Sequence, residues 1–247
     1  MNYEGSGMLL AKINGTKKRL HITDKVEDGD VVHKDIKLPA NQSFQMIPTD
    51  KERDIIYITG QSGSGKSYFT RMYADEYKKK HKKREIYLFS AIDDDESIDS
   101  IKDLKRINIK DPEFLEESIE LDDIKDSMCI FDDVDTITSK QIRGKVFGIL
   151  NMILQCGRHA NISVVYTSHI CCAGAETKLI LSEAHAVVIF PKTMGNRSLK
   201  YLCDSYFGMD KEQIKKIKQI GGRHAIIHKT YPMVVMGANS AFTTTDF

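Results

Sequence analysis

The chain has 247 residues, of which 41% are hydrophobic and 29% charged, a balance that supports a globular domain with a sizeable core. Its formal net charge is +1, so no overall basic field indicates nucleic acid, and such a partner would have to meet local patches. The five cysteines are odd in number and lack C-x-x-C spacing, which argues for reduced thiols rather than disulfides or a zinc site. There is neither a signal-peptide pattern nor an apolar run of about 18 residues, so no membrane span is expected.

Residues 1–50 differ from the rest of the chain and predict a small β-rich appendage. Met8–Ile13 and a run ending at Leu20–Ile22 flank Asn14-Gly15, which is typical of a β-hairpin. Residues 51–237 are expected to form the main domain, and residues 238–247 a flexible tail.

The segment 60–67 fits the spacing G-x-x-x-x-G-K-[ST] of a phosphate-binding loop, between an apolar strand at 55–58 and a helical pattern. Glycines allow backbone N–H groups to surround a phosphate, and the helix N-terminus adds a favourable dipole. Lys66 is expected to reach the β- and γ-phosphates and Ser67 to ligate Mg²⁺. A nucleoside triphosphate with Mg²⁺ is therefore the expected ligand, and the expected nucleotide-binding residues are Gly60, Gln61, Ser62, Gly63, Ser64, Gly65, Lys66 and Ser67.

The helix after the loop ends in the basic run Lys78–Arg84, which allows two interpretations. Its cations either complement the helix dipole at a solvated end or contact nucleic-acid phosphates. A strand at Glu85–Ser90 comes next, and residues 96–126 are expected to be an acidic surface connection with short helical pieces.

Four apolar residues, Met128–Phe131, predict a buried strand that ends in two carboxylates. Asp132 stands where phosphate-loop enzymes hold Mg²⁺. Asp133 is expected to orient the attacking water, although it could instead bind a water of the Mg²⁺ shell.

A helix at Lys140–Cys156, capped by Gly157, leads through Arg158 into a strand at 162–166. Three polar residues follow at the tip of that strand, and they either sense the γ-phosphate of a bound nucleotide or only terminate the strand. They are Thr167, Ser168 and His169. Further along lie a buried strand at 186–190, two helical segments and a closing β-ribbon. The alternation predicts an α/β fold, a mostly parallel sheet with helices on both faces.

Three motifs together carry a family resemblance: the loop 60–67, the strand end 130–133 and the run Gly157-Arg158-His159-Ala160-Asn161-Ile162-Ser163-Val164-Val165. They resemble the poxvirus-type genome-packaging ATPases of large DNA viruses, in the FtsK–HerA branch of RecA-like (ASCE) phosphate-loop NTPases. The likeness covers residues 53–190. Relatives often carry Gln at the position of His169, and cellular motors carry Glu at that of Asp133.

This resemblance implies ATP hydrolysis by a homo-oligomeric ring of about five or six subunits that drives double-stranded DNA into a capsid. It also implies a capsid or portal-vertex partner, and residence in the cytoplasm of the infected host cell or in the virion. Arg158 would be supplied to a neighbour's nucleotide, or else make a local helix-end contact. Two alternatives stay open, an ATP-gated assembly protein without translocation and a small-molecule phosphotransferase.

Overall fold

The computed structural model describes residues 1–25 and 32–244, and its contacts divide the chain into two compact units. One unit is the continuous segment Glu52–Ala184, and the other joins Met1–Lys51 to His185–Phe247. Within the described residues, no helix has both the length and the apolar character needed to cross a membrane.

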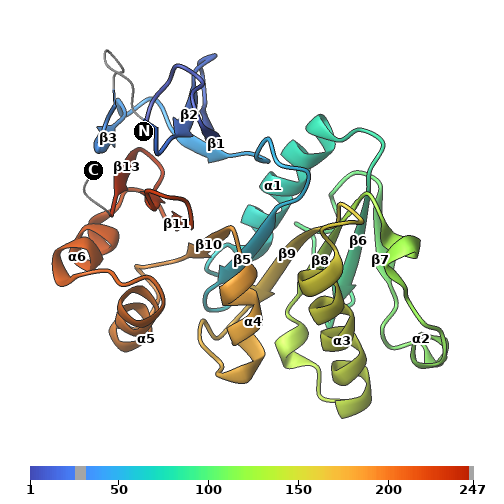
Figure 1. Ribbon diagram of the computed structural model, residues 1–247. Helices are drawn as coiled ribbons and strands as arrows, with labels where there is room; N and C mark the ends of the chain where they lie inside the picture. Colours follow the sequence, from blue (N-terminus) through green and yellow to red (C-terminus); the bar gives the residue numbers. More distant parts are fainter. Residues whose placement is uncertain (26–31, 245–247) are drawn as a thin grey trace. The chain divides into compact units, whose positions relative to one another are not determined.

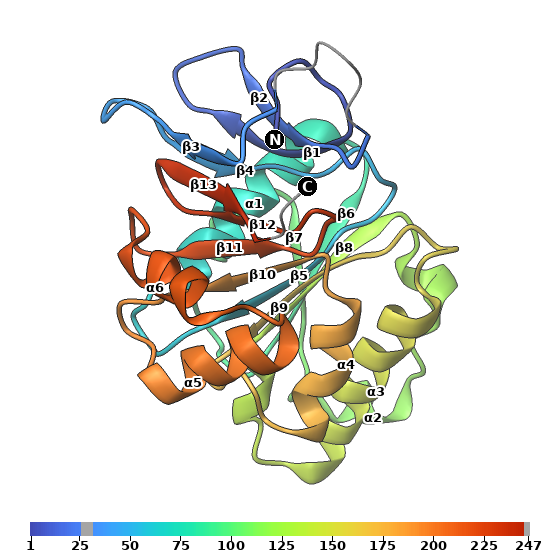
Figure 2. The same cartoon turned by 60° about the vertical axis from the view of Figure 1, so that its left-hand side comes forward.

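The unit 52–184 is built on a parallel sheet with helices on both faces (Figure 1). Helix α1 lies on one face, and α3 and α4 lie on the other in both ribbon views (Figures 1 and 2). The strands, in their order across the sheet, are β5 (Ile55–Thr59), β9 (Ser163–Ser168), β8 (Ser127–Asp132), β6 (Glu85–Ser90) and β7 (Leu104–Ile107). The helical segments are α1 (Lys66–Lys80), α2 (Pro112–Glu116), η1 (Leu121–Ile124), η2 (Val134–Thr136), α3 (Lys140–Cys156) and α4 (Ala175–Glu183).

The strands that carry the site are buried along their whole length. Every residue of β5, β8 and β9 is buried, because helices cover both faces of the sheet. This is why these segments read as continuous apolar runs, and it confirms the predicted α/β class. Strand β9 lies between β5 and β8, so the phosphate-loop strand and the strand that ends in Asp132 are separated by one neighbour.

One strand of this sheet is not predicted by the sequence. Residues 104–107 were expected in a surface connection, but they form the edge strand β7 beside β6. An edge strand is covered on fewer sides, and Leu104–Ile107 accordingly contains two basic residues and no apolar run.

The other unit contains two sets of antiparallel strands, and strands of both sets are labelled in Figure 2. The larger has the order β3 (Asp35–Lys37), β13 (Ser240–Thr243), β12 (Val234–Met236), β11 (Ala225–His228) and β10 (Ala186–Ile189), and the smaller β2 (Arg19–Ile22), β1 (Met8–Ile13) and β4 (Phe44–Met46). Its helical segments are α5 (Asn196–Tyr201), the π-helical η3 (Leu202–Tyr206) and α6 (Lys211–Gln219). The predicted hairpin at β1 and β2 and the C-terminal ribbon are both present.

Two expectations about the chain ends are corrected. Residues 1–50 do not form a separate appendage, because β3 pairs with β13 and the backbone N–H of Phe44 donates to the carbonyl of Ala238. The tail predicted at 238–247 contains the strand β13, which is ordered because Ala241 and Phe242 are buried. Residues 245–247 of that prediction lie outside the described part of the chain.

Candidate nucleotide site

The loop between β5 and α1 has the backbone geometry of an anion-binding turn. Gly63 has φ 74° and Gly65, which precedes the first residue of α1, has φ 112°. L-residues rarely adopt these conformations, so the glycines are needed for the loop to turn its N–H groups inward. The Ser64 hydroxyl is buried and has no hydrogen-bond partner among the described residues. An orphaned donor in such a loop fits an anionic ligand with several acceptor oxygens.

The Lys66 ammonium, which ends a side chain 7% exposed, is held inside the site. Its Nζ donates to the carbonyl oxygen of Gly60 at 3.1 Å and lies 3.3 Å from Nδ1 of His169. It also pairs with Oδ1 of Asp133 at 3.7 Å. The structure therefore brings together three residues that the sequence places far apart, the loop lysine, the expected water-orienting carboxylate and the sensor histidine.

Thr167 links the two carboxylates at the end of β8. Its hydroxyl donates to Oδ1 of Asp132 at 2.8 Å and accepts from the backbone N–H of Asp133 at 3.1 Å. Asp133 has φ 49°, a left-handed conformation that turns its side chain away from the course of the strand. A hydroxyl that donates to one neighbour and accepts from the other fixes the relative position of both carboxylates.

Asp132 is 1% exposed, and its electrostatic surroundings favour a bound cation. Burial, followed by the charge of Asp133, raises the pKa of this carboxyl to about 6, while the hydrogen bond from Thr167 acts in the opposite direction. A hard divalent cation beside the carboxylate would offset the burial penalty. Oxygen donors are the ligands that Mg²⁺ takes, so Ser67 and Asp132 fit a Mg²⁺ ion that accompanies a bound triphosphate.

Asp135 belongs to the site but was not found from the sequence. Its Oδ2 accepts from the hydroxyl of Ser168 at 2.8 Å and from the backbone N–H of His169 at 3.0 Å. These bonds hold the turn in which His169 reaches Oδ1 of Asp133 through Nε2, at 3.2 Å. Ligand atoms of Asp133, Asp135 and His169 lie within 4.8 Å of one another, and the Lys66 ammonium already supplies positive charge there. A carboxylate two residues after Asp133 has no distinguishing periodicity, and only the turn at η2 brings it to this position.

Arg158 is the one predicted site residue that lies elsewhere. It is exposed and precedes β9, whereas the loop, Asp132 and His169 all stand at the carboxyl ends of their parallel strands. The length of β9 therefore separates it from its own phosphate loop, a distance of about 20 Å. Among the described residues, its side chain has no hydrogen-bond or salt-bridge partner.

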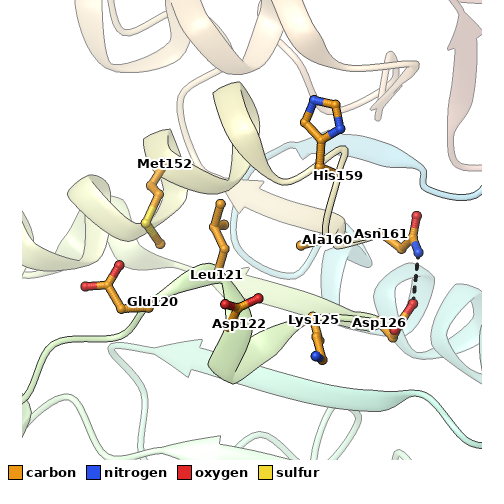
Figure 3. Close-up of a pocket in the computed structure, with 9 residues that line it drawn as sticks. All are labelled: Glu120, Leu121, Asp122, Lys125, Asp126, Met152, His159, Ala160 and Asn161. Atoms are coloured by element: carbon orange, nitrogen blue, oxygen red, sulfur yellow. Dashed lines mark hydrogen bonds between the residues drawn. The ribbon is translucent and has the colours of Figure 1, made fainter.

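A pocket of about 540 Å³ opens at the same edge as Arg158 (Figure 3). His159, Ala160 and Asn161 line it from the turn before β9, and Asn161 donates to Asp126 at 3.0 Å. The remaining lining residues are Glu120, Leu121, Asp122, Lys125 and Met152. It is distinct from the nucleotide site because its lining residues lie before β8 and β9 or near the end of α3, whereas the nucleotide site lies at the carboxyl ends of the strands.

Fold and site together define a phosphate-loop NTPase architecture. Solved structures share this fold: the DNA-packaging ATPase B204 of Sulfolobus turreted icosahedral virus is 17% identical, with a TM-score of 0.52 over 76% of this chain and 98% of that one. The genome-packaging NTPase B204 of the second such virus, in complex with AMP, is 16% identical with the same TM-score over the same shares. The cytoplasmic domain of the type VII secretion ATPase EccC from Thermomonospora curvata is 12% identical, with a TM-score of 0.54 over 83% of this chain and 28% of that one.

No protein-family model matches the chain. It is 36% identical over 248 residues to uncharacterized protein V3 of Sputnik virophage, covering 98% of both chains. The chain belongs to the family of that virophage protein.

Proposed function

We propose that this protein is a Mg²⁺-dependent ATPase that moves double-stranded viral DNA into a capsid. The observation that carries the proposal is the convergence of Lys66, Asp132, Asp133, Thr167 and His169 at one edge of the sheet. This convergence occurs in a fold shared with a DNA-packaging ATPase, and the related V3 protein is also viral. The motif resemblance supports the finer placement in the poxvirus-type FtsK–HerA branch.

The residues have distinct tasks in this reaction. When bound, ATP would supply the phosphoryl group, and Mg²⁺ would neutralise part of the negative charge on the phosphates. The loop 60–67 holds the phosphates through its N–H groups, and Lys66 exchanges its contact with Gly60 for the phosphate oxygens. Asp133, fixed by Thr167, orients the attacking water, and His169 reports the γ-phosphate to the turn held by Asp135.

Arg158 completes the site of a neighbouring subunit in this proposal. Its exposed side chain and its distance from its own loop support a role in trans, in a homo-oligomeric ring of about five or six subunits. An arginine finger of this kind contributes about 10³- to 10⁵-fold in rate. The ring would dock on a capsid or portal-vertex protein, in the infected cell's cytoplasm or in the virion.

The primary test measures ATPase rate with and without double-stranded DNA, beside a mass measurement of the assembly. DNA-stimulated hydrolysis by an oligomer is expected, and Lys66→Ala should abolish nucleotide turnover. Unstimulated hydrolysis by a monomer would contradict the motor. Phosphorylation of an added nucleoside would instead identify a phosphotransferase.

A mixing experiment tests the finger. Arg158→Ala should bind ATP and fail to hydrolyse it, and mixed rings with Asp133→Ala subunits should recover part of the activity. Arg71→Ala is the matched control, since Arg71 is also exposed and, within residues 1–25 and 32–244, its side chain makes only an i,i+4 pair with Asp75. Normal hydrolysis by the Arg158→Ala protein alone would remove this residue from the mechanism.

A further inference from the structure

The near-neutral net charge conceals two units of opposite charge. Residues 52–184 carry 19 Lys and Arg against 24 Asp and Glu, whereas residues 185–247 carry nine against four. The nucleotide-binding unit is therefore acidic, and the C-terminal part of the other unit is basic. On net charge, a polyanion would be attracted to the C-terminal part and not to the nucleotide-binding unit as a whole.

Within the basic part, helix α6 presents a row of cations on one side. Lys211, Lys215 and Lys218 have the spacing i, i+4, i+7, which places them within one face of an α-helix over about 10 Å. All three are exposed, and none has a hydrogen-bond or salt-bridge partner among the described residues. On the adjacent side of the helix, Ile214 and Ile217 are buried and attach the helix to the unit.

Helix stability does not explain the whole row. Cations in the last turn complement the helix dipole, which accounts for Lys218. Lys211 is the first residue of α6, where a positive charge opposes the dipole. Lys216 differs from the row, because it pairs with Asp35 at 3.5 Å and lies 5.3 Å from the Phe242 ring. The helix dipole thus explains Lys218 alone, and Lys211 and Lys215 have no described role in the fold.

We propose that the α6 row, defined as Lys211, Lys215 and Lys218, binds the phosphate backbone of double-stranded DNA. The inference rests on the proposed function and names the surface that meets its substrate. A linear array of ammonium groups matches the linear array of phosphates on a duplex strand. Because the contacts are to phosphate, binding is independent of base sequence, as a packaging motor requires.

The surrounding surface favours DNA over a lipid bilayer. A membrane-surface helix buries a face of Trp, Phe or Leu in the lipid. The apolar face of α6 is already packed inside the unit, and the large hydrophobic side chains exposed in the described part of residues 185–247 are Tyr201, Tyr206 and Tyr231.

The test measures binding of a fluorescently labelled duplex of mixed sequence by anisotropy across a salt series. The triple variant Lys211→Gln/Lys215→Gln/Lys218→Gln should bind about 10²-fold more weakly at low salt. The slope of log K against the logarithm of the salt concentration should become less negative by about 2 to 3, which is about 0.9 for each lost phosphate contact. Circular dichroism and thermal unfolding verify that the variant is folded.

The matched control is Lys82→Gln/Lys83→Gln/Lys102→Gln, which makes the same change in net charge on the nucleotide-binding unit. These lysines are also exposed and have no described partner, and Lys82 and Lys83 belong to the basic run after α1. The control should bind DNA as the unmodified protein does. A loss in the control with none in the α6 variant would overturn the proposal and move the contact to the end of α1.

The remaining outcomes separate this inference from the proposed function. If the unmodified protein binds duplex DNA and the α6 variant binds equally well, the inference fails while the motor stands. If the unmodified protein neither binds DNA nor is stimulated by it, the proposed function fails. If phosphatidylserine vesicles are bound more tightly than DNA through the same lysines, the surface is a lipid site.

Discussion

The hydroxyl of Thr167 offers a sharp test of the site, because Thr167→Val removes it with almost no change in shape. The substitution leaves the buried N–H of Asp133 without its 3.1 Å acceptor and Asp132 without its 2.8 Å donor. An unsatisfied buried polar group costs about 1–3 kcal/mol, so the free energy of unfolding should fall by about that amount. Since Asp133 is held in a left-handed conformation by this contact, its carboxylate should lose its fixed position.

Steady-state ATP hydrolysis reports the functional part of the effect. Misplacement of a positioned group by about 1 Å costs on the order of 10²-fold, so kcat should fall by about that factor while KM changes little. Thr167→Ser is the control, since it keeps the hydroxyl and loses one methyl group, about 1 kcal/mol of stability. If the valine variant keeps kcat within about threefold of the unmodified protein, Thr167 does not position Asp133 for catalysis.

Three further predictions address other parts of the structure. Asp135→Ala should lower kcat and reduce the free energy of unfolding by about 1–3 kcal/mol, because the hydroxyl of Ser168 and the N–H of His169 lose their acceptor. Asp135→Asn keeps an acceptor oxygen and should retain most of the activity. Equal effects of the two substitutions would contradict the hydrogen-bond role. Burial lowers the pKa of His228 from 6.5 to about 4, so the unfolded state binds the proton first, and stability should be complete above about pH 6.5 and decline as pH falls toward about 4. Denaturant unfolding should show a loss of about 2 kcal/mol between about pH 7.5 and pH 5 that His228→Leu lacks, and an unchanged pH profile in that variant would assign the effect elsewhere. Gly65→Ala should abolish nucleotide binding, because Gly65 has φ 112°, which an alanine rarely adopts. Gly148→Ala is the helical control: its added Cβ has open space, so the free energy of unfolding should rise by up to about 1 kcal/mol. A nucleotide affinity that Gly65→Ala leaves unchanged would contradict the loop geometry.

The sequence predicted the parallel sheet because its strands are buried on both faces. Burial on both faces requires continuous apolar runs, and β5, β8 and β9 have them. The same reasoning fails for strands near the margins of a sheet, which are only partly buried. It therefore missed β7, and it assigned Ser240–Thr243 to a loose tail although the strand is ordered by pairing with β12 and β3.

Some features of the candidate site follow from local sequence patterns, and others depend on contacts between distant segments. The loop 60–67, the carboxylates after β8 and the polar tip of β9 are local patterns, and parallel strands place such tips at one edge. The turn at η2 and the contacts of Asp135 depend on chain segments about 30 residues apart. No pattern within either segment predicts that Asp135 accepts hydrogen bonds from Ser168 and His169.

By itself, the sequence predicted the phosphate-loop pattern, the order of the buried strands and of the long helices between them, and which polar residues follow those strands; it did not predict β7 or β13. These properties depend on spacing and burial, which a linear pattern records. The tertiary structure alone decided that Lys66, Asp133 and His169 contact one another, that Arg158 lies at the opposite edge, and that residues 1–51 group with residues 185–247. Each of these depends on register, turn geometry or strand pairing between distant segments, which the order of residues does not display.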